Sequence, residues 1–204
     1  MNETKTYLRP PQPAPQGGGR AAVGSAVIGL GILCVAIPVF RDLLLQGRPG
    51  SAGLVAIAGY GALLSACFLA MRMTGMSWEE VGVRALSARS LAVGIIAGTL
   101  VVAPVWRLPL ISFSDGTWLL IAVAVEEVAF RGVLFAILRR AGRLPLAIGG
   151  SAFAFTVAHA GSAGWPSLVL VALAGIFFGL LRAVRGDLWT SGFAHLIIDL
   201  VSLP

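Results

Sequence analysis

The sequence predicts an all-α, polytopic transmembrane bundle of about seven helices with a polar site inside the membrane. Hydrophobic residues make up 57% of the 204 residues and charged residues only 12%, and the mean hydropathy is +0.90. These values lie outside the range of water-soluble globular domains. The apolar residues also fall into separate stretches of roughly 16 to 22 residues, a length that crosses a bilayer as a helix.

Residues 1–20 precede the first of these stretches and are rich in proline and glycine, including the run Gly17–Gly19. Such a composition cannot bury enough apolar surface to offset the entropy of ordering, so we expect a disordered cytoplasmic tail. The next stretch, Ala21–Phe40, is long enough to span a bilayer and lacks a cleavage site of small residues. We therefore expect it to remain as the first helix and not to be removed as a signal peptide.

Six further apolar stretches bring the expected number of spans to seven, give or take one, because the shortest are at the lower limit for a span. One of the last three could be re-entrant or could use flanking residues to reach across. The six stretches are Gly50–Met71, Ser90–Trp106, Thr117–Leu138, Leu144–Ala160, Pro166–Leu181 and Leu188–Leu203.

Two kinds of local pattern add detail to this bundle. Ser77 and Glu80 form a Ser-x-x-Glu capping box, so residues 77–88 are either a short helix at the membrane surface or an ordinary polar loop. The motifs Gly94-x-x-x-Gly98 and Gly175-x-x-x-Gly179 place small residues on one helix face, where they let another helix approach closely.

The basic residues indicate how the bundle is oriented. Eleven of the 15 lie in the tail and in the second, fourth and sixth loops, whereas three, Arg41, Arg48 and Arg107, lie on the other side. Cytoplasmic loops carry the excess of positive charge, so we expect a cytoplasmic N-terminus. The charges are spread over short loops and form no patch, so the expected partner is the lipid bilayer and not nucleic acid. Abundant Ala, Gly and Arg with a single lysine favour a bacterial cell membrane.

Six ionisable side chains fall inside the predicted spans, where a charge costs a few kcal/mol and usually marks a functional site. Glu127 and Arg131 are four residues apart, as are His195 and Asp199, so each pair lies on one helix face. On an α-helix, Glu126 points about 100° away from Glu127, so the two carboxylates can do different work. The six residues are Glu126, Glu127, Arg131, His159, His195 and Asp199.

Three motifs built on these residues resemble those of one family. Glu126-Glu127-Val-Ala-Phe-Arg131 resembles E-E-x-x-x-R, Phe155-Thr-Val-Ala-His159 resembles F-x-x-x-H, and His195-Leu-Ile-Ile-Asp199 resembles H-x-x-x-N/D. They occur in the order found in the CAAX protease and bacteriocin-processing (CPBP, or Abi) family of intramembrane peptidases. The resemblance covers roughly residues 117–200. We accordingly divide the chain into a tail (1–20), N-terminal helices with the surface helix (21–116) and a CPBP-like catalytic core (117–204).

The resemblance implies an intramembrane endopeptidase that acts on a membrane-associated peptide or protein. Glu126 and His159 would activate a water molecule, and His195 with Asp199 would hold the polarised carbonyl or a metal ion. Glu127 and Arg131 would brace the site. Phe155 is expected to serve only in packing.

Asp199 and the metal question leave alternatives open. An ionised aspartate cannot donate to an oxyanion, so Asp199 is either kept protonated, or is a metal ligand, or orients His195. His159, His195 and Asp199 would suit zinc, although no compact zinc motif occurs. Zinc-dependent and metal-free sites are therefore both considered.

Other functions are also compatible with buried ionisable groups. Proton-coupled transporters also contain such groups. Many transporters are built from two matching repeats, and no such repeats are visible in this sequence. A non-catalytic relative acting in bacteriocin immunity or as a scaffold would keep the same fold. A buried polar network that only fixes helix packing is the structural alternative for Glu126, His159 and His195.

Overall fold

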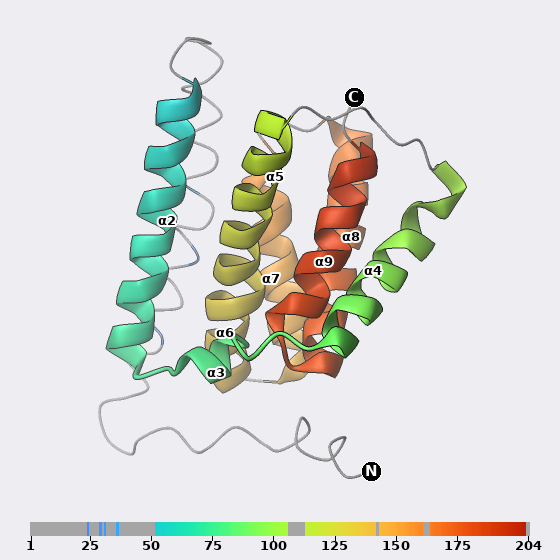
Figure 1. The fold of residues 1–204 in the computed structure, drawn as a ribbon. Coiled ribbons are helices and arrows are strands. Elements are labelled where there is room, and N and C mark those ends of the chain that lie inside the picture. Colours follow the sequence, from blue (N-terminus) through green and yellow to red (C-terminus); the bar gives the residue numbers. More distant parts are fainter. Residues whose placement is uncertain are drawn as a thin grey trace, which may run out of the picture.

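The computed structural model describes residues 52–105, 113–141, 143–160 and 164–202, together with the helical residues 24, 29, 31 and 36. Figure 1 shows an arrangement of helices, and no strand occurs in these ranges. The all-α prediction is therefore confirmed. The predicted tail and, apart from those four residues, the predicted span Ala21–Phe40 lie outside the described residues.

Each of the six later apolar stretches forms a helix at about the predicted place. The fourth predicted span is one continuous run of three segments: α5 (Phe113–Glu126), the π-helix η3 (Glu127–Leu134) and α6 (Phe135–Ala141). The predicted division between residues 116 and 117 falls inside α5 and stays a prediction. The other helices are α2 (Ala52–Thr74), α4 (Ala88–Val102) with the 3-10 turn η2 (Ala103–Val105), α7 (Leu144–Ala158), α8 (Trp165–Arg185) and α9 (Leu188–Ser202).

The α5–η3–α6 run lies at the centre of the described bundle, in contact with α2, α7 and α9 (Figure 1). Helix α4 packs on α9, and α8 packs on α7. Both contacts use the predicted small-residue motifs. A Cβ atom at Gly94 would lie 2.6 Å from the carbonyl oxygen of Thr190 in α9, and one at Gly175 would lie 3.2 Å from Ala152 in α7. These glycines therefore set how closely the helices approach, as predicted.

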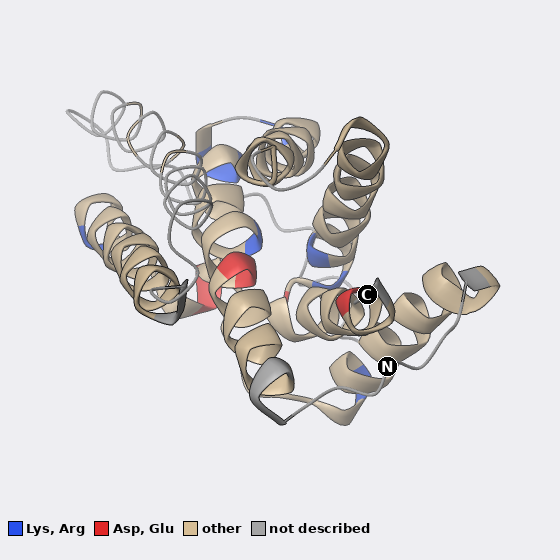
Figure 2. Ribbon diagram, turned by 90° about the horizontal axis from the view of Figure 1, so that it is seen from above, with Lys and Arg blue, Asp and Glu red and all other residues tan. Residues whose placement is uncertain are grey.

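Apolar side chains cover the exterior of the described bundle as well as filling its core. Leu54, Leu100 and Phe153 are at least 70% exposed, whereas the charged Glu127 and Arg131 are buried. Seen along the bundle, most of the ribbon carries no charge (Figure 2). An apolar exterior, with the few charged groups turned inward, is the arrangement that a lipid environment favours.

The helices differ in how far they reach across a membrane. By length and composition, α2 from Leu54 onward and α8 can each cross one. Helices α4, α7 and α9 contain 15 residues each, or about 22 Å, against about 30 Å for the hydrocarbon core. These three need flanking residues or a locally thinner bilayer, as the short predicted spans suggested.

The short helix α3 (Trp78–Val81) begins with the predicted capping box. Ser77 Oγ accepts a hydrogen bond from the Glu80 amide at 3.2 Å, and Glu80 Oε2 accepts one from the Ser77 amide at 3.0 Å. The helix ends at Gly82, whose φ of +95° is one that glycine adopts readily. Residues 83–87 are not helical, so the segment combines a one-turn helix with a loop.

Candidate active site

The E-E-x-x-x-R motif lies where the central run changes from α-helix to π-helix. Glu126 is the last residue of α5, and Glu127 and Arg131 belong to η3. The α-helical geometry predicted for this motif is therefore wrong from Glu127 onward. A π-helix pairs residues i and i+5, is rare, and occurs frequently at functional sites. Hydropathy and spacing do not distinguish the two helix types, because both keep residues i and i+4 on nearly the same side.

Glu127 holds the ring of His195 in one orientation. Glu127 Oε1 lies 3.0 Å from His195 Nδ1, and Ser191 Oγ donates a hydrogen bond to Glu127 Oε2 at 2.5 Å. All three side chains are buried. An ionised carboxylate only accepts hydrogen bonds, so Nδ1 carries the proton in this contact. The remaining ring nitrogen, Nε2, is then the atom available for chemistry.

Two other carboxylates face that nitrogen. Nε2 of His195 lies 3.4 Å from Asp199 Oδ2 and 3.8 Å from Glu126 Oε2. The side chain of Asp199 is 38% exposed and that of Glu126 14%, against 4% for Glu127. Glu126 and Asp199 therefore form the accessible side of the cluster. Glu127 contacts Nδ1 of His195 and Asp199 contacts Nε2, so the alternatives considered for Asp199 all stay predictions.

Arg131 closes the deep end of the cluster. The predicted pair with Glu127 is present, with 3.5 Å between Arg131 Nη1 and Glu127 Oε1. Arg131 is fully buried, and its nitrogens make no hydrogen bond within the described ranges. Its Cζ lies 4.0 Å from the ring centre of Phe155 and 4.9 Å from that of Phe178. The guanidinium is thus stabilised by one carboxylate and two aromatic faces.

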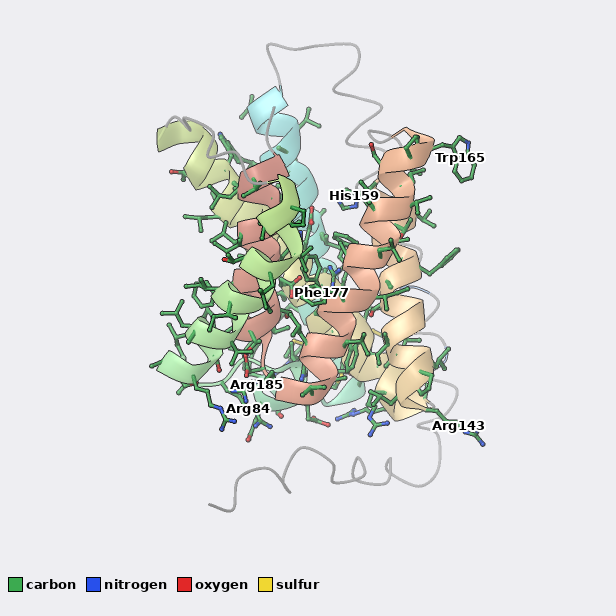
Figure 3. All side chains as sticks on the ribbon, turned by 90° about the vertical axis from the view of Figure 1, so that its right-hand side faces the viewer. Arg84, Arg143, His159, Trp165, Phe177 and Arg185 are labelled. Carbon is green, nitrogen blue, oxygen red and sulfur yellow. The ribbon has the colours of Figure 1, made fainter. Side chains whose placement is uncertain are left out.

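His159 lies at the C-terminal end of α7, on the edge of the cluster. Its Nδ1 is 2.8 Å from the carbonyl oxygen of Phe155, which can only accept, so Nδ1 carries the proton. The Phe155 ring contacts both histidines, with centroid distances of 4.5 Å to His159 and 5.5 Å to His195. His159 lies toward the end of the bundle opposite Arg84, Arg143 and Arg185 (Figure 3).

The fold brings most of the six predicted residues into direct contact. Glu126, Glu127, Arg131, His195 and Asp199 are linked by direct contacts, and His159 and His195 both contact the Phe155 ring. No three His, Cys, Asp or Glu side chains in the described part of the chain are arranged to hold a metal ion. The zinc set His159, His195 and Asp199 is thus not gathered around one point there, and zinc stays a prediction from the sequence.

Two residues of the site were not predicted. Ser191 could have been found, because it precedes His195 by four residues and shares its face of α9. Phe178 had no such signal. It comes from α8, and its ring stacks on His195 at 4.5 Å only because α8 packs beside α9. Phe155 is a packing residue, as predicted, but it packs against site residues.

Comparison with known families gives a match over the part of the chain that contains the site. Residues 109–201 match the family model described as "Type II CAAX prenyl endopeptidase Rce1-like". The matched segment contains all six predicted site residues. No curated protein and no solved structure matches the chain.

Proposed function

We propose that the chain is an intramembrane endopeptidase in which Glu126 activates water, because residues 109–201 match the model of the type II CAAX prenyl endopeptidase family. The family is one of membrane proteases, and it implies a peptide or protein substrate. The observation that carries the proposal is the orientation of His195: Glu127 fixes Nδ1, while Nε2 faces Glu126 and Asp199.

Glu126 is the general base of the proposed reaction. It takes a proton from a water molecule that His159 helps to hold, and the resulting hydroxide adds to the carbonyl carbon of the scissile bond. The carbonyl oxygen becomes an oxyanion. His195 stabilises it in the doubly protonated form, with Nδ1–H held by Glu127 and Nε2–H donating a hydrogen bond to the oxyanion. When the C–N bond breaks, Glu126 returns its proton to the leaving nitrogen. The partial exposure of the Glu126 side chain, 14%, supports contact with substrate.

Glu127 and Arg131 have a positioning function in this proposal. Both are too deeply buried to touch a substrate. Glu127 fixes the orientation of the His195 ring through Nδ1, and Arg131 balances the charge of Glu127 in a region of low dielectric. Asp199 is exposed enough to contact the substrate carbonyl and, if protonated, to donate to the oxyanion.

The substrate class follows from where the site lies. The substrate is a membrane-associated peptide or protein, since the cluster is enclosed by helices with apolar outer faces. The bias of arginines predicts that the end carrying Arg84, Arg143 and Arg185 is cytoplasmic, which leaves His159 toward the opposite side (Figure 3).

Cleavage of a fluorogenic, membrane-associated peptide by the purified protein in detergent tests the proposal. Glu126→Gln should lower turnover by about 100-fold or more, because the amide cannot accept the proton. Glu79→Gln is a matched control, since the Glu79 side chain is 76% exposed at the surface. Near-normal turnover by Glu126→Gln would show that the proposed base is wrong. A non-catalytic scaffold or immunity protein, or a proton relay detectable as proton uptake by vesicles, would then be favoured.

A further inference from the structure

Another buried arginine, outside all three motifs, contacts the site helix. Arg182 in α8 is 6% exposed, and no carboxylate in the described ranges pairs with it. Its hydrogen bonds go instead to main-chain carbonyls. Nε donates to the Arg131 carbonyl at 3.1 Å, and Nη2 donates to the Glu80 carbonyl at 2.8 Å. One guanidinium thus joins α8 to the π-helix η3 and to the surface helix α3.

The surroundings of Arg182 are shaped to admit it. A Cβ atom at Gly82 would lie 2.7 Å from Arg182 Cζ, so any larger residue there would displace the guanidinium. The ring centre of Phe135 lies 5.4 Å from the same atom. Nearby, a Cβ atom at Gly132 of η3 would lie 2.7 Å from Val81 Cγ1. The surface helix and the π-helix therefore meet closely around this side chain.

Three successive contacts connect Arg182 to the reactive imidazole. Arg182 bonds the main chain of Arg131, the Arg131 side chain lies 3.5 Å from Glu127, and Glu127 lies 3.0 Å from His195. A π-helix is a rare conformation that occurs frequently at functional sites. A charge-assisted hydrogen bond to one of its carbonyls is a strong fixed contact from a neighbouring helix.

We propose that Arg182 is a positioning residue of the peptidase site: by bonding the Arg131 carbonyl it fixes the π-helix and so sets the Glu127 carboxylate against His195. The effect of Arg182 on catalysis rests on the proposed function. Its effect on the position of the His195 ring does not. The bond to Glu80 also couples the surface helix α3 to the site.

Arg140 provides a matched control, because it anchors the same surface helix without bonding η3. Its Nη2 lies 2.7 Å from Glu80 Oε1, and its Nη1 donates to the Thr74 carbonyl at 2.7 Å. Each of the variants Arg182→Gln and Arg140→Gln therefore removes a contact to Glu80 of α3, the first to its carbonyl and the second to its carboxylate. Only Arg182→Gln also removes the contact to the π-helix. Arg182→Lys keeps the charge but lacks the forked geometry that reaches both carbonyls.

Nitrogen NMR of the labelled imidazoles is the measurement that is independent of activity. The chain contains two histidines, so ¹⁵N-histidine in detergent-solubilised protein reports on His159 and His195 alone. Arg182→Gln and Arg182→Lys should shift or broaden the His195 Nδ1 signal, and Arg140→Gln should leave it unchanged. If Arg182→Gln does not fold, Arg182→Lys decides.

Peptide cleavage by the same preparations supplies the second readout. The Arg182 variants should lose about tenfold to a hundredfold in kcat with little change in KM, because a displaced carboxylate misplaces the imidazole. The inference would be overturned if the folded Arg182 variants kept the His195 Nδ1 signal and the kcat of the wild type. It would also be overturned if Arg140→Gln shifted that signal as much as the Arg182 variants do. If the wild-type protein cleaves nothing, the proposed function fails, while the NMR comparison still tests the effect of Arg182 on His195.

Discussion

Two glutamate–arginine pairs in this molecule have the same chemistry in opposite surroundings. Glu127 and Arg131, in the bundle centre, are 3.5 Å apart with side chains 4% and 0% exposed. Glu80 and Arg140, at the arginine-rich end, are 2.7 Å apart with side chains 43% and 20% exposed. The outer pair has the better geometry, since Arg140 donates to both carboxylate oxygens and to the Thr74 carbonyl.

Burial, and not distance, decides how much each pair matters. An exposed pair contributes about 0–1 kcal/mol, because water and salt screen it. Removing one partner of a buried pair costs about 3–5 kcal/mol, because a charge is left without compensation. We therefore expect that removing one partner destabilises the protein more at the central pair, Glu127 and Arg131, than at the outer pair. We also expect the central pair to contribute more to the placement of His195 than to net stability.

The largest effect is expected for Arg131→Ala. Loss of the guanidinium leaves Glu127 unpaired and should destabilise the protein by about 3–5 kcal/mol, with a lower yield of folded protein. Thermal unfolding in detergent measures this. The double variant Glu127→Gln with Arg131→Met removes both charges and should recover much of the stability while remaining inactive. An Arg131→Ala protein as stable as the wild type would contradict the comparison.

A smaller effect is expected for Asp199→Asn, at the exposed edge of the site. If Asp199 acts as a protonated donor, the asparagine amide replaces it and turnover should stay within about tenfold of the wild type. If it is a metal ligand, the variant should lose both activity and bound zinc. Peptide cleavage and metal analysis of one preparation separate these cases. Loss of both activity and bound zinc in Asp199→Asn would show that the protein is a metallopeptidase.

The smallest effect is expected for the outer pair. Burial alone would raise the pKa of Glu80, but hydrogen bonds from Arg140 and Ser77 hold that pKa below its ordinary value of 4.5. The pair therefore contributes stability above about pH 4.5 and loses it as the pH falls through the lowered pKa. A double-mutant cycle of Glu80→Gln and Arg140→Gln should give a coupling below about 1 kcal/mol at pH 7. The difference in unfolding temperature between wild type and Glu80→Gln should vanish in acid. A difference that increases as the pH falls would contradict the lowered pKa of Glu80.

The features that sequence predicted well are those that depend on near neighbours in the chain. The capping box at Ser77 and Glu80 formed as expected, because both partners lie within one turn. The pairs Glu127 with Arg131 and His195 with Asp199 also formed, because residues four apart share a helix face. The glycine motifs at Gly94 and Gly175 correctly identified contact faces, although neither named its partner helix.

By itself the sequence determined the helical class, the approximate helix positions and the group of ionisable residues, because hydropathy and short-range spacing act within a single helix. Only the tertiary structure decided which carboxylate meets which nitrogen of His195, since Glu127 and His195 are 68 positions apart and meet through helix packing. The same applies to Arg182 and the Arg131 carbonyl, 51 positions apart. The π-helix that contains Glu127 and Arg131 was also known only from the structure, because hydropathy and spacing do not distinguish this rare conformation from an α-helix.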